Sequence, residues 1–512
     1  MKKTNFNPNK LLFKAKKYKI SKFFKNEWLH FLAVCSNFFK EKGFLKYFAF
    51  VYFVYFIGYF GLLRANVYYI DDLGRSKDGY FGFLNFSRYL SENLSKLIHL
   101  NLYTNTDISP ITQLIAIAIL SFGSMLLVKI IVKKQNYFAL FASIPLGLSP
   151  FFLENMSYKF DSPFMALALI SPIIPFLFLR KKFCFFIVSI LAILTALNTY
   201  QAANSVYIVL SMFFIFLMFI NKNTLRYICI NLSVFIFSYI IALGIYKFYI
   251  ATNVNTYVSS EIIKENFIKG VFENIKKTLD IYNNAVNHTA FKYILCIVIF
   301  IFLIASFKKS KINKINTLIL GIIFIITSIC FTQGAYLVLK TPLFATRAFN
   351  SIGVLVSIIF IYSLNFNKFN ISKIIICFGI YFLIIQANSY ANALKAQDDY
   401  SKIRMELMYS DINKIIPDDN VKFNIFITKG IDDSPVVKNS IKNFPIINSL
   451  VFQRLGPYWY WSGSANFQNF GFKGKYVLTK CYKDENKIIK VLDTHMHKIT
   501  QYDNNCFTIE FK

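Results

Sequence analysis

The sequence predicts an all-α polytopic membrane protein with about eleven transmembrane helices, followed by a small C-terminal α/β domain. The 512 residues are 55% hydrophobic and only 16% charged, which is too little polar surface for a soluble protein of this length. Lysine and arginine gather in short clusters between apolar runs. The net charge of +31 is therefore a topology signal, and nucleic-acid binding is not expected.

The apolar runs follow one another and have close to the ~20 residues that a helix needs to cross a bilayer. They cover residues 44–63, 111–132, 137–153, 163–179, 183–199, 202–220, 227–250, 293–307, 316–332, 351–366 and 374–386. We predict a transmembrane domain over residues 44–388, with two long extracytoplasmic loops at 64–110 and 251–292.

Residues 1–43 are rich in lysine and nearly free of acids, which predicts a basic cytoplasmic or interfacial N-terminus. The first apolar run is longer than the hydrophobic part of a signal peptide, and no A-x-A-like site follows it. We therefore expect an uncleaved first span. Residues 28–39 fit either a short helix on the inner leaflet or a solvated basic tail.

Every second connection between the runs is short and basic, which predicts that these connections share the cytoplasmic side with the N-terminus. The basic positions are Lys133 and Lys134, Arg180 to Lys182, Lys222 and Arg226, Lys308 to Lys314, and Lys368 and Lys373. The more acidic connections, including the segment after the first span and the turn at 154–161, fall on the extracytoplasmic side. So does everything after Asn388.

Residues 389–512 form the predicted extracytoplasmic domain. Residues 391–415 read as a helix leaving the membrane, and β-like runs at 421–428, 476–480 and 507–511 alternate with Gly and Asp turns. Cys481 and Cys506 fit either a disulfide, as an oxidising compartment allows, or two unrelated reduced thiols.

Asp71 and Asp72 are adjacent carboxylates just past the first apolar run of a chain poor in acids. Such a pair can take a proton from a hydroxyl, or hold a divalent cation that binds a phosphate. The competing interpretation is an aspartate that caps a helix or sits in a turn. The centres of the spans carry no Asp, Glu, Lys or Arg, whereas an ion-coupled transporter would keep such groups there. This favours an enzyme over a transporter.

Four cations fall on the same predicted side as the acidic pair: Arg75, Arg88, Lys159 and Arg347. Arginine and lysine at an apolar boundary suit a phosphate, which arginine holds with two hydrogen bonds. Taken singly, each also fits an interface anchor. Their convergence with the acids predicts a phosphate-binding site.

Four further residues are candidates for contacting a sugar. Glu154 and Asp161 flank the short turn that contains Lys159, and Tyr200 and Gln201 lie in a tight turn between two spans. An aromatic ring can stack on a sugar and an amide can bond its hydroxyls, although an aromatic belt explains the tyrosine equally well. The histidines show no metal-ligand spacing.

Six blocks in this order resemble the serotype-converting O-antigen glucosyltransferase family, polytopic enzymes of the GT-C type. The blocks are YYIDDLGRSKDGY (68–80), SRYL (87–90), SYKFDSPFMALAL (157–169), TYQAAN (199–204), TRAFNSIGVL (346–355) and SYANALKAQDDY (389–400). The family usually has a Gly-Arg-Pro-Leu-like block in place of SRYL, and an arginine where Lys159 stands. Both departures keep the cation.

The resemblance implies transfer of a sugar, glucose in this family, from a polyprenyl-phosphate donor to a lipid-linked O-antigen or related polysaccharide. The reaction would take place at the outer face of a bacterial inner membrane, by direct displacement at the anomeric carbon. Asp71 or Asp72 would deprotonate the acceptor hydroxyl, and the four cations would stabilise the leaving phosphate. The residues identify no certain cofactor and no nucleotide-binding signature is needed, while a divalent cation at Asp71 and Asp72 stays open.

Two other classes of function share the same predicted topology. A flippase or carrier for lipid-linked saccharides would move the lipid without forming a glycosidic bond. A surface-polysaccharide polymerase or ligase would change chain length in place of adding a branch.

Overall fold

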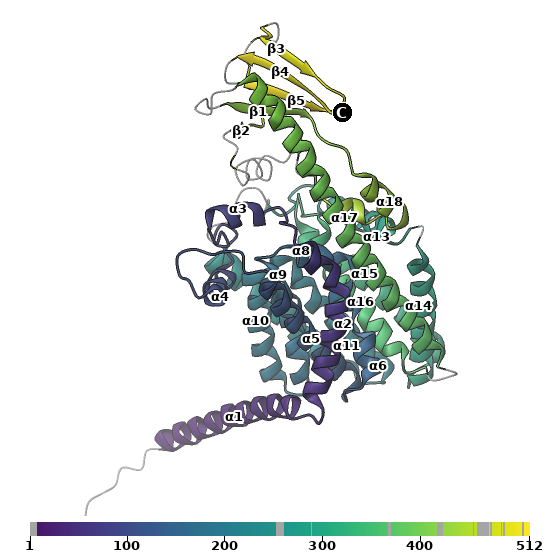
Figure 1. The fold of residues 1–512 in the computed structure, drawn as a ribbon. Helices are drawn as coiled ribbons and strands as arrows, with labels where there is room; N and C mark the ends of the chain where they lie inside the picture. Colours follow the sequence, from purple (N-terminus) through teal and green to yellow (C-terminus); the bar gives the residue numbers. More distant parts are fainter. Residues whose placement is uncertain are drawn as a thin grey trace, which may run out of the picture.

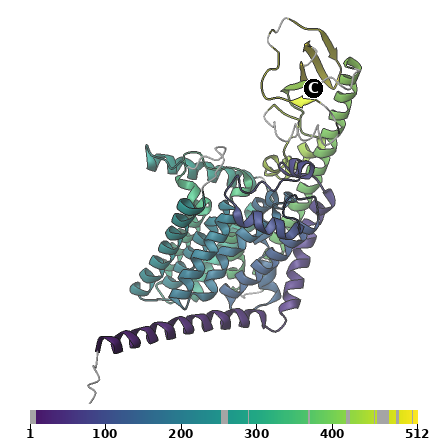
Figure 2. The same cartoon turned by 90° about the vertical axis from the view of Figure 1, so that its left-hand side faces the viewer.

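The computed structural model describes residues 8–251, 261–287, 289–366, 370–416, 423–453, 455–457, 471, 474–482, 484, 487–503 and 506–512. A bundle of apolar helices forms the body of the molecule (Figures 1 and 2). A small sheet lies beyond one end of the bundle, and the helix α1 (Pro8–Phe39) runs across the other end. We call these the sheet end and the α1 end.

Within the described residues, eight helices are long and apolar enough to cross a membrane, or up to nine if a bent pair counts as one span. The long apolar elements are α2 (Phe44–Ala65), α5 (Ile111–Val132), α10 (Lys182–Thr199), α11 (Ser205–Ile220), α12 (Leu225–Ile245), α14 (Ala290–Lys309), α15 (Lys314–Cys330) and α17 (Ile371–Ile415). Around them lie the π-helical turn η3 (Tyr246–Ile250) and the 3-10 segments η2 (Gln201–Asn204) and η4 (Phe331–Val338). The chain is therefore mostly helical, as predicted.

Three of the predicted runs are short or broken helices. The run at 137–153 is divided into α6 (Tyr137–Ala142), α7 (Pro145–Leu148) and α8 (Pro150–Ser157), with a bend of 63° before α8. The run at 163–179 begins as α9 (Ser162–Ile170) and tightens into the 3-10 segment η1 (Ser171–Phe178), which contains two prolines. Proline lacks the N–H that continues an α-helix. With α16 (Ser351–Ser363) also short, the count of eleven spans stays a prediction.

The basic connections gather at the α1 end. Lys181 pairs with Glu27 of α1 at 3.8 Å, and Lys129 pairs with Glu41, just after α1, at 2.6 Å. The helix that the sequence placed at 28–39 is part of the longer α1. The clustering agrees with the predicted arrangement of loops, while the side of the membrane that each end faces stays a prediction.

Helix α2 packs against α17 and α5. A Cβ at Gly61 of α2 would lie 2.6 Å from Asn388 Oδ1 and 3.1 Å from Ala391 Cβ of α17, so this position requires glycine. The close approach brings the segment after α2 to the part of α17 that leads towards the sheet.

Helix α17 has 45 residues and runs without a break from the bundle to the sheet, so the domain boundary predicted at residue 388 falls within it. The sheet order is β2-β1-β5-β4-β3, with β1 (Asn424–Lys429) parallel to β2 (Lys475–Tyr476) and to β5 (Cys506–Phe511). β3 (Lys490–Asp493) and β4 (His497–Asp503) complete it as antiparallel strands. Residues 421 and 422 of the predicted first strand lie outside the described residues.

The sheet packs on the last turns of α17 through a separate apolar core that includes Met405, Met408 and Ile412. Cys481 and Cys506 form a disulfide, which decides between the two interpretations left open by the sequence. Between β1 and β2 the chain returns to the bundle through α18 (Pro435–Asn443) and α19 (Ile447–Leu450).

The predicted loop 251–292 contains the helix α13 (Phe267–Val286), and its residues 252–260 and 288 lie outside the described residues. Asn274 of α13 donates hydrogen bonds to the carbonyl oxygens of Leu337 and Leu339, at 2.9 and 3.0 Å. The loop is therefore fixed to the segment that follows α15.

Candidate active site

Asp72 is the first residue of the short helix α3 (Asp72–Asp78) and is fully buried. Its Oδ2 accepts hydrogen bonds from the backbone N–H groups of Tyr69 (3.0 Å) and Lys159 (2.9 Å), and its Oδ1 accepts one from Phe160 N–H (3.4 Å). Burial raises the pKa of Asp72 to about 7, although these N–H groups favour the ionised form. Asp72 thus joins the segment after α2 to the segment between α8 and α9.

Asp71 occupies the N-cap position of α3, but its side chain makes no capping hydrogen bond. The residue is partly exposed, and among the described residues its carboxylate has no hydrogen bond or ion pair. Burial raises the pKa of Asp71, while the guanidinium groups of Arg75, Arg347 and Arg88 act in the opposite direction. Ile70, directly before it, has a φ of 39°, a strained value for a β-branched residue. Asp71 therefore has the free carboxylate oxygens that Asp72 lacks.

Arg75 and Asp161 form a buried ion pair with a 2.5 Å contact between Nη1 and Oδ2. The guanidinium also lies over the ring of Phe83, at 4.5 Å from its centroid. This pair connects α3 to the start of α9. It leaves Arg75 Nε buried, with no hydrogen-bond partner among the residues that the structure describes.

Lys159 is buried and pairs with Asp107, with 3.0 Å between Nζ and Oδ2. Its ammonium group also lies 4.0 Å from the ring centroid of Tyr68. Partial burial opposes ionisation of Asp107, but hydrogen bonds from Ser109 and the pairing with Lys159 lower its pKa overall. The sequence interpretation did not single out Asp107, because one acid in a long polar loop carries no recognisable spacing.

Arg347 lies in the short 3-10 segment η5 (Thr346–Ala348) and is held by the buried carboxylate of Glu154 from α8. Its backbone N–H donates to Glu154 Oε2 at 2.8 Å, and its Nη1 donates to Oε1. The charge of Arg347 is thereby compensated within the protein.

Arg88 precedes α4 (Tyr89–His99) and is held by neutral groups. Its Nε donates to Gln201 Oε1 at 2.8 Å, and its guanidinium lies 4.8 Å from the ring centroid of Tyr200 and 5.1 Å from that of Phe86. Gln201 Nε2 in turn donates to Phe86 O at 2.7 Å and to Tyr246 Oη at 2.8 Å.

No ion pair of Arg88 exists among the described residues, which distinguishes it from Arg75, Lys159 and Arg347. The hydroxyl of Tyr200 is buried and has no hydrogen-bond partner within the described part of the chain. Arg88 is therefore a partly exposed cation whose positive charge is available to an anion.

The structure brings all the predicted site residues to the sheet end of the bundle, where α3, α4 and α8 lie close together (Figure 1). Asp71 is within electrostatic reach of Arg75, Arg88 and Arg347. Tyr336 of η4 lies within electrostatic reach of the same Arg88 and Arg347 and was not predicted. The binding and catalytic roles of these residues stay predictions.

Within the described residues, no group of three or more His, Cys, Asp or Glu side chains is arranged to hold a metal ion. Since backbone N–H groups already occupy Asp72, a divalent cation at the acidic pair would use the oxygens of Asp71. The cation that the sequence left open stays a prediction.

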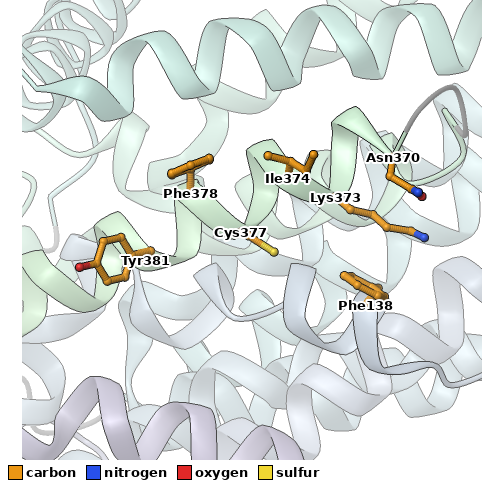
Figure 3. A pocket seen from close by; sticks show the side chains of 7 residues that line it. All are labelled: Phe138, Asn370, Lys373, Ile374, Cys377, Phe378 and Tyr381. Carbon is orange, nitrogen blue, oxygen red and sulfur yellow. The ribbon is translucent and has the colours of Figure 1, made fainter.

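A cavity of about 500 Å³ lies between α6 and the start of α17 (Figure 3), and α6 lies towards the end of the bundle opposite α3 (Figure 1). Its lining is mainly apolar and aromatic, with Lys373 as its charged group. Because it contains no carboxylate to act as a base, we assign it no part in the chemistry at the sheet end.

Replacing Asp72 by alanine is expected to lower the free energy of unfolding by about 2–4 kcal/mol, because three buried backbone N–H groups would lose their acceptor. The thermal unfolding midpoint of the purified protein in detergent measures this loss. Asp78→Ala is the matched control, since Asp78 lies at the exposed end of the same helix and its one ion pair in the described residues is with Lys77. An unchanged midpoint for Asp72→Ala would contradict the anchoring role.

Comparison with known proteins connects this geometry to a family. The family model described as "Glucosyl transferase GtrII" matches residues 59–364, from within α2 to the end of α16. A protein of Salmonella phage P22, described as "Uncharacterized 55.3 kDa protein in gtrB 5'region", is 24% identical over 425 residues, which cover 79% of this chain and 86% of that protein. No solved structure matches the chain significantly.

Proposed function

The chain belongs to the glucosyl transferase GtrII family, and from this membership we propose that it transfers a glucosyl group from a polyprenyl-phosphate donor to a lipid-linked O-antigen or related surface polysaccharide. Membership makes the chain a glycosyltransferase with a sugar donor and a glycan acceptor. The observation that carries the finer proposal is that a carboxylate, Asp71, and a cation, Arg88, neither with an ion pair among the described residues, lie at the same end of an apolar bundle.

In the proposed reaction, Asp71 accepts the proton of the acceptor hydroxyl as its oxygen attacks the anomeric carbon of the donor. The bond from that carbon to the phosphate oxygen breaks, and the lipid phosphate leaves with the bonding electrons. Arg88 donates N–H hydrogen bonds to the phosphate oxygens, whose negative charge grows in the transition state. A single displacement of this kind inverts the configuration at the anomeric carbon.

The paired cations have a supporting part in this mechanism. Arg75 and Arg347 lie near Asp71 and favour its ionised form, although each already has a carboxylate partner. Binding a phosphate through either one would require that pair to open, at a cost that Arg88 does not pay. We therefore assign the donor phosphate to Arg88 first.

The lipid form of the donor fits the apolar character of the bundle. The described residues contain eight helices long and apolar enough to cross a membrane, and the polar site lies at one end of this bundle. A sugar that arrives on a polyprenyl phosphate would reach this end from within the bilayer, so the protein needs no nucleotide-binding fold.

We propose that the chain lies in a bacterial inner membrane with the α1 end in the cytoplasm and the sheet end outside. The basic connections at the α1 end support this orientation. The disulfide between Cys481 and Cys506 supports it independently, because disulfides persist in oxidising compartments.

Purified protein in lipid nanodiscs is expected to transfer labelled glucose from polyprenyl-phosphate glucose to a lipid-linked acceptor, and to transfer none from UDP-glucose. The labelled product is separated by chromatography and its glycosidic bond is identified by mass spectrometry. Transfer from UDP-glucose alone would refute the lipid donor. Movement of the lipid without a new glycosidic bond would indicate a flippase or carrier, and a longer acceptor backbone would indicate a polymerase or ligase.

A further inference from the structure

A cavity of about 370 Å³ lies where the bundle meets the returning segment that contains α18 and α19. The bundle contributes Ile70, Glu154 and Arg347, and the returning segment contributes Asp433 and Gln453 among other polar groups. Small-ligand sites span roughly 300–1,000 Å³, so this cavity has the size of a binding site. Ile70, which lines it, directly precedes Asp71, and Arg347, also in the lining, is within electrostatic reach of the Asp71 carboxylate.

The wall formed by the returning segment is attached to the loop that carries Asp71. Tyr69 Oη donates to Leu450 O at 2.8 Å, and the Tyr69 ring meets that of Phe452 edge to face with centroids 4.9 Å apart. Thr346 Oγ1 adds a hydrogen bond to Ser449 O at 3.4 Å. These contacts hold both walls of the cavity in one position relative to Asp71.

Asp433 is positioned by the long helix α17. Gln397 of α17 accepts a hydrogen bond from Ser434 N–H at 2.8 Å and donates one to Asp432 O at 3.4 Å, so both neighbours of Asp433 are fixed. The Asp433 side chain is partly exposed and accepts from Gln453 Nε2 at 3.0 Å. Among the described residues it has no cationic partner.

The lining suits an uncharged molecule with several hydroxyl groups. Asp433 accepts hydrogen bonds, and the amides of Gln453 and of the exposed Asn448 both donate and accept them. Arg347, the cation of the lining, is already neutralised by Glu154. Among the described residues of the lining, a donor phosphate would find no free cation, whereas Arg88 supplies one elsewhere at the sheet end.

We propose that this cavity binds the acceptor saccharide, through an uncharged sugar unit whose hydroxyls bond to Asp433, Asn448 and Gln453. The bound unit presents one further hydroxyl to Asp71. This inference rests on the proposed function and names its acceptor site, which lies between the bundle and a segment beyond the residues that the family model matches.

Asp433→Asn tests the site in the purified full-length protein. We expect the KM for the acceptor to rise about 10-fold to 100-fold, as for loss of a hydrogen bond to a charged group. The KM for the donor and kcat are expected to stay within about threefold, because Arg88 and Asp71 are untouched. Asp432→Asn is the matched control, since Asp432 is exposed and pairs with Lys438 at 3.3 Å. It is expected to leave both KM values unchanged.

Asn448→Ala is a second variant; because it removes an exposed side chain, it is expected to leave the fold intact. It is expected to raise the acceptor KM several-fold. The inference would be overturned if both variants kept the native acceptor KM, or if the donor KM rose and the acceptor KM did not. Binding of the acceptor saccharide without donor, measured by calorimetry, separates the two proposals. If the native protein binds the saccharide but transfers no glucose, only the proposed function is refuted. If the native protein transfers glucose and both variants keep the native acceptor KM, only the acceptor site is refuted.

Discussion

Replacing Asp71 by asparagine is expected to lower kcat for glucosyl transfer by about 10²–10⁴-fold, the usual contribution of a general base. Asparagine has nearly the shape of aspartate but cannot accept the proton of the acceptor hydroxyl. Because the Asp71 side chain makes no hydrogen bond or ion pair among the described residues, the substitution breaks no native contact. Initial rates of transfer in nanodiscs, with the unfolding midpoint of each protein, measure the effect.

The pH dependence of the native enzyme gives the same base a second readout. Turnover is expected to fall as the pH drops through the pKa of Asp71, which lies above the ordinary value for an aspartate, because only the ionised form accepts a proton. Asp78→Asn, at the exposed end of α3, is expected to retain native rates. More than half of native turnover in Asp71→Asn, or an equal loss in Asp78→Asn, would exclude Asp71 as the base.

Arg88→Ala is expected to lower kcat by about 10²–10³-fold. A loss of this size is typical when one preorganised hydrogen-bond donor that stabilises the transition-state charge is removed. The KM for the polyprenyl-phosphate donor is expected to rise, while the KM for the acceptor stays near native. Arg88→Lys should recover part of the activity, because it keeps the charge but not the planar group that bonds Gln201 and stacks on Tyr200. Steady-state kinetics with each substrate varied in turn measure these changes.

Arg64→Ala is the matched control for Arg88. Arg64 is an exposed cation at the end of α2, where it hydrogen-bonds Asn392 of α17. Its removal is expected to leave transfer within about twofold of native, as is usual for an exposed contact. Native kinetics in Arg88→Ala would remove Arg88 from the donor site, and equal losses in Arg88→Lys and Arg88→Ala would indicate a packing role alone.

Much of the fold follows from the sequence because long apolar runs have one stable form in a bilayer. The run at 111–132 has the same bounds as α5, and the run that begins at Phe44 is α2 extended by two residues. The prolines around residues 145–150 and 172–175 can be seen in the sequence as well. However, packing decides where each helix bends and whether its two parts form one span. The continuity of α17 was also hidden, because its apolar and polar halves differ in composition.

The site was predictable by residue type but not by pairing. Arg75 meets Asp161, and Lys159 meets Asp107, only in the folded chain. The sequence therefore indicated four cations but not their partners. It could not show that, among the described residues, Arg88 is the one of the four without an ion pair. Asp71 and Asp72 look equivalent in the sequence. They differ in the structure because successive helical positions point about 100° apart, which turns Asp72 inward and leaves Asp71 partly exposed.

The structure of the surface polysaccharide tests the central claim most directly. Three otherwise identical bacterial strains would carry the native chain, the Asp71→Asn chain or neither, and the abundance of each chain in the membrane would be matched by immunoblot. Mass spectrometry and linkage analysis are predicted to find a glucosyl branch only in the strain with the native chain. An identical polysaccharide in all three strains would contradict glucosyl transfer, and a branch made by the Asp71→Asn chain at native level would contradict Asp71 as its base.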